Sequence, residues 1–121
     1  MDKTIIINRH KYKISSIKDI DKLIDKFKDN KLNKEDETIY HILCKNIEDK
    51  DHMAYLFFKT IDNKHLTLKD KDGWTPLHYF AMGSITGILH LTESATVIDN
   101  IGFRPIDIFL MFIKKENLTL A

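Results

Sequence analysis

The sequence predicts a mainly α protein built from repeated helix–turn–helix units, preceded by a short N-terminal β-hairpin and a capping helix. The first observation is the segment Thr75-Pro76-Leu77-His78, which follows Gly73. Gly73 suits a tight turn, Thr75 suits a helix N-cap, and Pro76 suits the first helical position. The second observation is that a similar frame recurs on both sides of this segment. The third is a pair of β-type runs near the N-terminus, which predicts the hairpin.

The first 31 residues differ from the rest of the chain. Thr4–Ile7 and Lys11–Ile14 are short β-type runs separated by polar residues, which predicts a hairpin. Ser16 and Asp19 then fit an acidic form of the capping box, and apolar residues follow at helical spacing to predict a helix over Ser16–Asp29. We expect residues 1–31 to cap the first repeat, and residues 32–121 to form the repeats within the same structural domain.

Three frames predict three repeats, over residues 33–69, 70–98 and 99–121. The upstream frame places Thr38 on Thr75, and the downstream frame places Arg104 on Thr75. The intervals are 37 residues (38 to 75) and 29 residues (75 to 104), with a mean of 33. Too few residues remain at the end for a second helix in the third repeat. The expected elements are an extended loop over Asp62–Asp72 and helices over Thr38–Asn46, Lys50–Thr60, Thr75–Met82, Ile85–Thr92 and Pro105–Lys115.

The segment Asp70–His78 resembles the start of an ankyrin repeat. This resemblance implies an ankyrin-type array of about three repeats, similar to small free-standing ankyrin proteins of viruses, phages and intracellular bacteria. Terminal repeats in such arrays are often atypical. The departures from the pattern here are Asp36 for the turn glycine, Ile39 for proline, Ser84 for glycine, Arg104 for threonine and Asp107 for histidine.

Length and composition fit one globular domain. The chain has 121 residues, of which 43% are hydrophobic and 31% are charged. No run of about 20 apolar residues predicts a membrane span, and the N-terminus lacks the layout of a signal peptide. Cys44 is the single cysteine, so no internal disulfide can form. We therefore expect a cytoplasmic protein, including the cytoplasm of a host cell if the source is a virus or an effector-producing bacterium.

No residue pattern predicts catalysis, and we expect no catalytic residue, cofactor or metal. His41 and His78 occupy the same slot of successive repeats, and the ankyrin resemblance implies that their rings hydrogen-bond to neighbouring loops. Cys44 lies among apolar residues and is expected to be an inert core thiol. The four glycines are scattered, so they form no phosphate-binding loop. We expect a protein that is not an enzyme.

The ankyrin resemblance implies a binding face made of loops and first helices. It predicts a protein-binding module that acts as a non-enzymatic inhibitor or adaptor by occupying a partner's surface, as viral or phage proteins do with host factors and as bacterial effectors do. Large apolar side chains at such positions are typical interface anchors. The predicted partner-binding residues are Lys71, Asp72, Trp74, Met82, Ile101, Phe103, Met111 and Phe112.

Three alternatives remain open. The first is an immunity protein that binds a cognate toxin. The second is a nucleic-acid-associated regulator that uses a basic N-terminal patch of Arg9, Lys11 and Lys18. Residues 1–31 carry nine Lys/Arg and five Asp, whereas residues 32–121 carry ten Lys/Arg and thirteen Asp/Glu. The acids among the N-terminal cations disfavour nucleic acid as a partner. The third is a structural homodimer closed by the apolar face.

Overall fold

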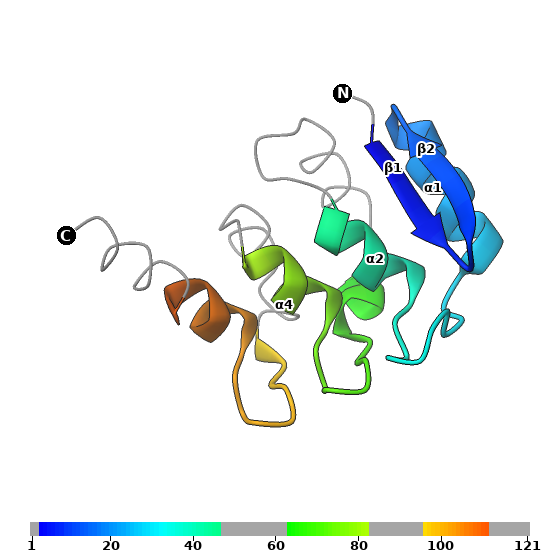
Figure 1. The fold of residues 1–121 in the computed structure, drawn as a ribbon. Helices are drawn as coiled ribbons and strands as arrows, with labels where there is room; N and C mark the ends of the chain where they lie inside the picture. Colours follow the sequence, from blue (N-terminus) through cyan, green and yellow to red (C-terminus); the bar gives the residue numbers. More distant parts are fainter. Residues whose placement is uncertain (1–2, 47–62, 83–95, 112–121) are drawn as a thin grey trace.

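A computed structural model describes residues 3–46, 63–82 and 96–111 of the chain (Figure 1). Strands β1 (Lys3–Ile7) and β2 (His10–Ile14) form an antiparallel hairpin in which Ile5 pairs with Tyr12. The two turn residues, Asn8 and Arg9, have φ angles of 52° and 72°. Positive φ at both central residues is the geometry whose twist matches that of the flanking strands. The turn therefore forms without the glycine that usually favours it.

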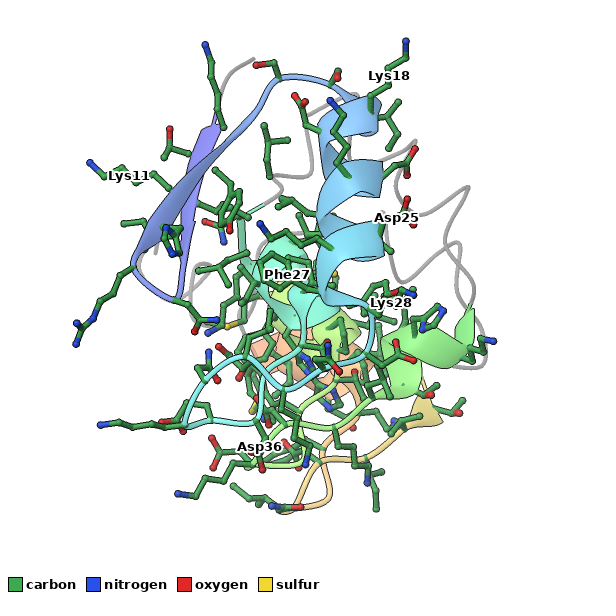
Figure 2. The ribbon with its side chains drawn as sticks, turned by 90° about the vertical axis from the view of Figure 1, so that its right-hand side faces the viewer. Lys11, Lys18, Asp25, Phe27, Lys28 and Asp36 are labelled. Atoms are coloured by element: carbon green, nitrogen blue, oxygen red, sulfur yellow. The ribbon has the colours of Figure 1, made fainter. Side chains whose placement is uncertain are left out.

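Helix α1 (Ile17–Phe27) packs on the inner face of this hairpin (Figure 2). It begins where the Asp19 carboxylate accepts hydrogen bonds from the backbone N–H groups of Ser15 and Ser16, at 2.8 and 3.2 Å. It ends at Lys28, whose positive φ of 51° takes the chain out of the helix. Alternate strand residues and one helix stripe are buried against each other, namely Ile5, Ile7, Ile14, Ile20 and Leu23.

Beyond α1, the described chain contains helix α2 (Ile39–Asn46), the 3-10 helix η1 (Asn63–Thr67) and helix α4 (Pro76–Ala81). Residues 105–111 are also helical. Figure 1 shows α2, α4 and residues 105–111 in a row, each preceded by a loop, with the three loops side by side along the same edge. The hairpin and α1 lie at the α2 end of this row.

One hydrophobic cluster runs from the hairpin to α4. It includes Ile7 of β1, Ile20 of α1, Leu43 of α2, Leu66 of η1 and Leu77 of α4. These side chains are essentially removed from solvent, with at most 1% of their surface exposed. The N-terminal hairpin is therefore part of the same core as the helices rather than a separate body.

The prediction of an ankyrin-type array of helix–turn–helix repeats is wrong. The described residues form a hairpin and short helices, and no clear array of paired helices is present among them. The physical reason lies in what the motif encodes. A turn glycine followed by Thr-Pro-Leu-His specifies a turn and a capped helix start, and it says nothing about a second helix. What recurs among the described residues is a loop that leads into a helix.

Two predicted helices, Lys50–Thr60 and Ile85–Thr92, lie outside the described residues, as does the end of the predicted helix Pro105–Lys115. The predicted extended loop over Asp62–Asp72 is also partly wrong, because η1 occupies its first half. Three contacts explain why a helical turn forms there. Leu66 is buried in the core, the His65 ring stacks on Tyr40 with centroids 4.6 Å apart, and His65 Nδ1 lies 2.8 Å from Asp29 Oδ1.

None of the described helices is long and apolar enough to cross a membrane.

We predict that Leu77→Ala lowers the free energy of unfolding by about 2–5 kcal/mol, because the side chain is fully buried and its removal leaves a cavity. Urea unfolding followed by circular dichroism measures the loss. Leu110→Ala is the matched control, because Leu110 is 55% exposed and should change stability by less than about 1 kcal/mol. Equal effects of the two substitutions would show that the core has been misplaced.

Candidate functional site

The loop before α4 is organised by one buried carboxylate. Asp70 Oδ1 accepts hydrogen bonds from the backbone N–H groups of Asp72 and Trp74, both at 2.9 Å. The Asp70 backbone N–H donates to the Trp74 carbonyl at 2.8 Å, and Gly73 N–H donates to the Asp70 carbonyl at 3.0 Å. The loop is thereby folded back so that Thr75 stands at the helix start.

The same arrangement recurs in two other loops. Asn33 Oδ1 accepts from the N–H groups of Glu35 and Glu37, and Asp99 Oδ1 accepts from those of Ile101, Gly102 and Phe103. We call each loop together with its following helix a loop–helix unit. The first unit spans residues 33–46, the second 70–82 and the third 99–111.

The first unit achieves this geometry without a turn glycine. Asp36 adopts a positive φ of 59° at the position where the other units have Gly73 and Gly102, with φ of 79° and 103°. Aspartate tolerates the left-handed region better than most residues do. The substitution of Asp36 for glycine therefore leaves the loop geometry intact.

Two histidine rings join successive units. His41 Nδ1 accepts from the Thr38 backbone N–H at 3.0 Å, and His41 Nε2 lies 2.9 Å from the Trp74 carbonyl oxygen of the second unit. His78 repeats this with Thr75 at 3.0 Å and with the Phe103 carbonyl of the third unit at 2.8 Å. Because Nδ1 must accept from an N–H, the neutral ring carries its proton on Nε2 and donates to the carbonyl.

Burial lowers the pKa of both histidines below the usual value, because the charged ring is poorly solvated. The carbonyl hydrogen bonds and nearby carboxylates oppose this effect but do not overcome it. Protonation would also place a proton on Nδ1, facing the threonine N–H that it now accepts. The links between units therefore require neutral rings.

The third unit lacks this link. Asp107 stands in the histidine slot, and its Oδ2 accepts from the Arg104 backbone N–H at 2.8 Å, as the Nδ1 atoms do in the other units. The Arg104 side chain pairs with the same carboxylate at 3.1 Å. An aspartate keeps the helix-start acceptor but has no second nitrogen to donate to a following loop. The histidine links therefore end at the third unit.

The loop backbones also contact each other directly. Lys71 N–H donates to the Glu35 carbonyl at 2.8 Å, and Asn100 N–H donates to the Asp72 carbonyl at 3.1 Å. Asn100 packs so tightly on Gly73 that a Cβ there would lie 2.4 Å from Asn100 Oδ1 and 2.6 Å from its backbone nitrogen. Glycine is thus required at position 73 for close approach as well as for its positive φ.

The predicted binding residues are arranged along these units. Lys71 and Asp72 are exposed at the tip of the second loop, and Ile101 is 81% exposed in the third loop. Met82, Phe103 and Met111 are also exposed, whereas Phe112 lies outside the described residues.

Trp74 is only half-buried, but it is not a freely presented anchor. Its indole Nε1–H donates to Asp99 Oδ2 at 2.9 Å, which ties the second loop to the third. Its ring packs against His78 and Tyr79, with centroids 5.4 and 4.9 Å apart. Trp74 therefore supports the fold in addition to lining the surface.

Two positions in each unit correspond to each other. Glu37, Trp74 and Phe103 each directly precede the helix-cap residue, and Lys45, Met82 and Met111 each lie seven residues after that cap. In the first unit the two positions touch, because Glu37 Oε2 is ion-paired with Lys45 Nζ. In the second and third units, an aromatic residue and a methionine occupy these two positions. Their backbones are therefore close together as well. We call Trp74, Met82, Phe103 and Met111 the apolar stripe.

A cluster of polar and charged side chains lies beside the Glu37–Lys45 pair of the first unit. Lys45 Nζ lies over the Tyr79 ring, 4.7 Å from its centroid, and the Tyr79 hydroxyl donates to Asp70 Oδ2. Burial and the Asp70 carboxylate raise the pKa of Tyr79, so the phenol stays protonated as a donor. Burial raises the pKa of Glu37, but hydrogen bonds and the charge of Lys45 outweigh this and bring it below its usual value. The sequence marks neither contact, because Glu37 and Lys45 are eight residues apart, well beyond the i, i+3 or i, i+4 spacing of helical side-chain pairs, and nothing local marks Tyr79.

The structure does not bring Arg9, Lys11 and Lys18 into one patch. Arg9 lies in the hairpin turn, whereas Lys18 lies in the first turn of α1, beyond the opposite end of β2. In Figure 2, Lys11 points away from α1 on the outer side of the hairpin, and Lys18 lies at the top of the helix.

The described residues contain no cluster of three or more His, Cys, Asp or Glu side chains that could hold a metal ion. Cys44 is buried, and burial raises the pKa of its thiol. No protein-family model matches the chain, and a search of curated proteins found no match either. The ankyrin resemblance therefore rests on the sequence motif alone.

We predict that the protein loses stability as the pH falls below about 6.5. The pKa values of His41 and His78 are lowered by folding, so the unfolded chain takes up protons first, and the free energy of unfolding falls between about pH 6.5 and the folded-state pKa values. Urea midpoints at about pH 7.5 and about pH 5.5 measure the slope. His78→Asn should flatten it, and the exposed-site control His10→Asn should not. A slope that is unaffected by His78→Asn contradicts the neutral-ring link.

A glycine pair tests the contact between loops. Gly102→Ala introduces only the backbone cost of a positive φ, about 1–2 kcal/mol, because nothing lies within 4 Å of its Cβ position. Gly73→Ala adds a clash with Asn100 and should cost about 1–3 kcal/mol more. Thermal or urea unfolding of the two variants gives the difference directly. A smaller loss for Gly73→Ala than for Gly102→Ala would mean that the second and third loops are not in contact.

Proposed function

We propose that this chain is a protein-binding module that acts by occupying a partner's surface, with the apolar stripe as its binding surface. The observation that carries the proposal is the repeated exposure of large apolar side chains at corresponding positions. Met82 is 44% exposed, Phe103 37% and Met111 46%. Aromatic and methionine side chains are typical of interface centres, and clustered exposure of this kind is unusual on a free surface.

The first unit supports this interpretation by contrast. Where the stripe would continue, it carries the Glu37–Lys45 ion pair, which satisfies itself within the chain. The second and third units replace this charged pair with apolar side chains at the same positions, although the loop geometry does not require them. Phe103 uses only its backbone carbonyl for the His78 link, so its ring is available to a partner.

The links between units give the stripe a defined shape before binding. The Trp74 and Phe103 carbonyls are both held by histidine rings, so the backbone that carries these side chains is fixed in the unbound protein. A preorganised surface loses less conformational entropy when it binds. We propose non-enzymatic inhibition or bridging as the mode of action, in the cytoplasm, where the lone Cys44 thiol stays reduced.

The test replaces the stripe methionines with the residue that the first unit carries at the same position. Met82→Lys with Met111→Lys should leave the fold intact, because Lys45 is accommodated there. Binding to a partner isolated with the wild-type protein should weaken at least tenfold, about 1.4 kcal/mol, when titrated with the purified partner. Light scattering on the wild type tests in addition whether the partner is a second copy of the chain.

Leu110→Lys is the matched control. Leu110 is 55% exposed and directly precedes Met111, but adjacent helix residues do not face the same way. This variant introduces the same charge and should bind the partner within about threefold of the wild type. A double variant that folds and binds at full strength rules out the stripe as the site.

A further inference from the structure

We propose that the outer face of the β-hairpin is a second interaction surface, which binds an extended acidic segment of another protein. The register assigns the residues of this face. Ile6 pairs with Lys11 and Thr4 with Lys13, and these four side chains are all exposed, whereas Ile5, Ile7 and Ile14 face the core. Ile6 is 63% exposed at the centre of the face.

The charged side chains of the described hairpin residues have a single sign. Lys11 and Lys13 lie on it, Arg9 is exposed at its turn end, and residues 3–14 contain no Asp or Glu. Three further cations, Lys18, Lys22 and Lys26, are on α1, where exposed Asp21 and Asp25 lie between them. Figure 2 shows Asp25 on α1 and Lys11 on the opposite side of the hairpin, pointing away from the helix. The mixed charge of α1 therefore does not extend onto the outer face.

The spacing of the cations favours an extended partner. Residues two apart on a strand lie about 7 Å apart on the same face, which is also the spacing of alternate side chains in an extended peptide. A segment with Glu at alternate positions can thus place successive carboxylates beside Lys11 and its neighbouring cations. Opposite charges facing each other in this way attract, and like charges repel, so the face discriminates against a basic segment.

The apolar centre favours a protein over nucleic acid or lipid. Two or three cations are few for a nucleic-acid site, since the affinity of proteins for DNA depends strongly on how many phosphates their cations neutralise. Ile6 offers nothing to a phosphate but can pack against an apolar residue of a peptide. This surface is separate from the apolar stripe, so it does not depend on the proposed function.

The test uses a dye-labelled synthetic peptide of alternating Glu and Val, with the matching Lys–Val peptide as its counterpart. Fluorescence anisotropy with the full-length chain should show binding of the Glu peptide only, weakened by added salt. Lys11→Glu together with Ile6→Ser should weaken binding about tenfold, equivalent to 1.4 kcal/mol. Lys22→Glu, which introduces the same charge change on α1, should alter it by less than about twofold.

Four results would overturn the proposal. These are equal binding of the two peptides, no binding of the Glu peptide, and equal losses in the Lys11→Glu/Ile6→Ser and Lys22→Glu variants. The fourth is tighter binding of a duplex DNA oligonucleotide, or of phosphatidylserine vesicles, that is lost in Lys11→Glu/Ile6→Ser. This last result would assign the face to nucleic acid or to a membrane surface instead.

Discussion

The imidazole rings of His41 and His78 each contact three groups: the backbone N–H and the hydroxyl of a threonine at a helix start, and the carbonyl of the next loop. Each ring is buried, so its hydrogen bonds face little competition from water, and leaving either nitrogen unsatisfied would cost about 1–3 kcal/mol. The direct loop contacts, such as Lys71 to Glu35, depend on the same alignment. The side-by-side arrangement of the three units therefore depends on the hydrogen bonds of these two side chains.

In each unit, the residues that hold the fold together stand at different positions from the residues whose side chains can vary on the surface. The first two units carry a buried threonine and a buried histidine at their framework positions, and each of the three units has a loop carboxylate or amide that accepts backbone hydrogen bonds. In the second and third units, the residue before the cap contributes its backbone carbonyl to the histidine link, so the link does not depend on the identity of its side chain. The chain has Glu37 there in one unit and Phe103 in another, with no change in loop geometry. Apolar side chains can therefore occupy these surface positions while the hydrogen bonds between the units stay in place.

The sequence predicted helix starts better than it predicted how elements assemble. Thr75 and Pro76 begin α4 as expected, and Ser16 and Asp19 begin α1, because capping is encoded within four residues. The paired helices of an ankyrin-type array did not follow from the same motif, since a cap does not specify what comes after its helix. The contacts of Trp74 with Asp99 and of Tyr79 with Asp70 join residues far apart or on different elements, and no local pattern marks them. Trp74 was thus predicted as a binding residue, but its tie to the third loop was not.

The most direct test of this account is the tautomeric state of His41 and His78 at about pH 7, below which unperturbed imidazoles begin to protonate. Long-range proton–nitrogen correlation spectra report which ring nitrogen carries the proton. The account predicts the neutral Nε2–H tautomer for both rings, with slow exchange of the Nε2 protons because each is donated to a buried carbonyl. Exposed His10 provides the internal reference, with rapid exchange. A protonated Nδ1 on either buried ring, or Nε2 protons that exchange as fast as those of His10, would contradict the link on which the arrangement of the units depends.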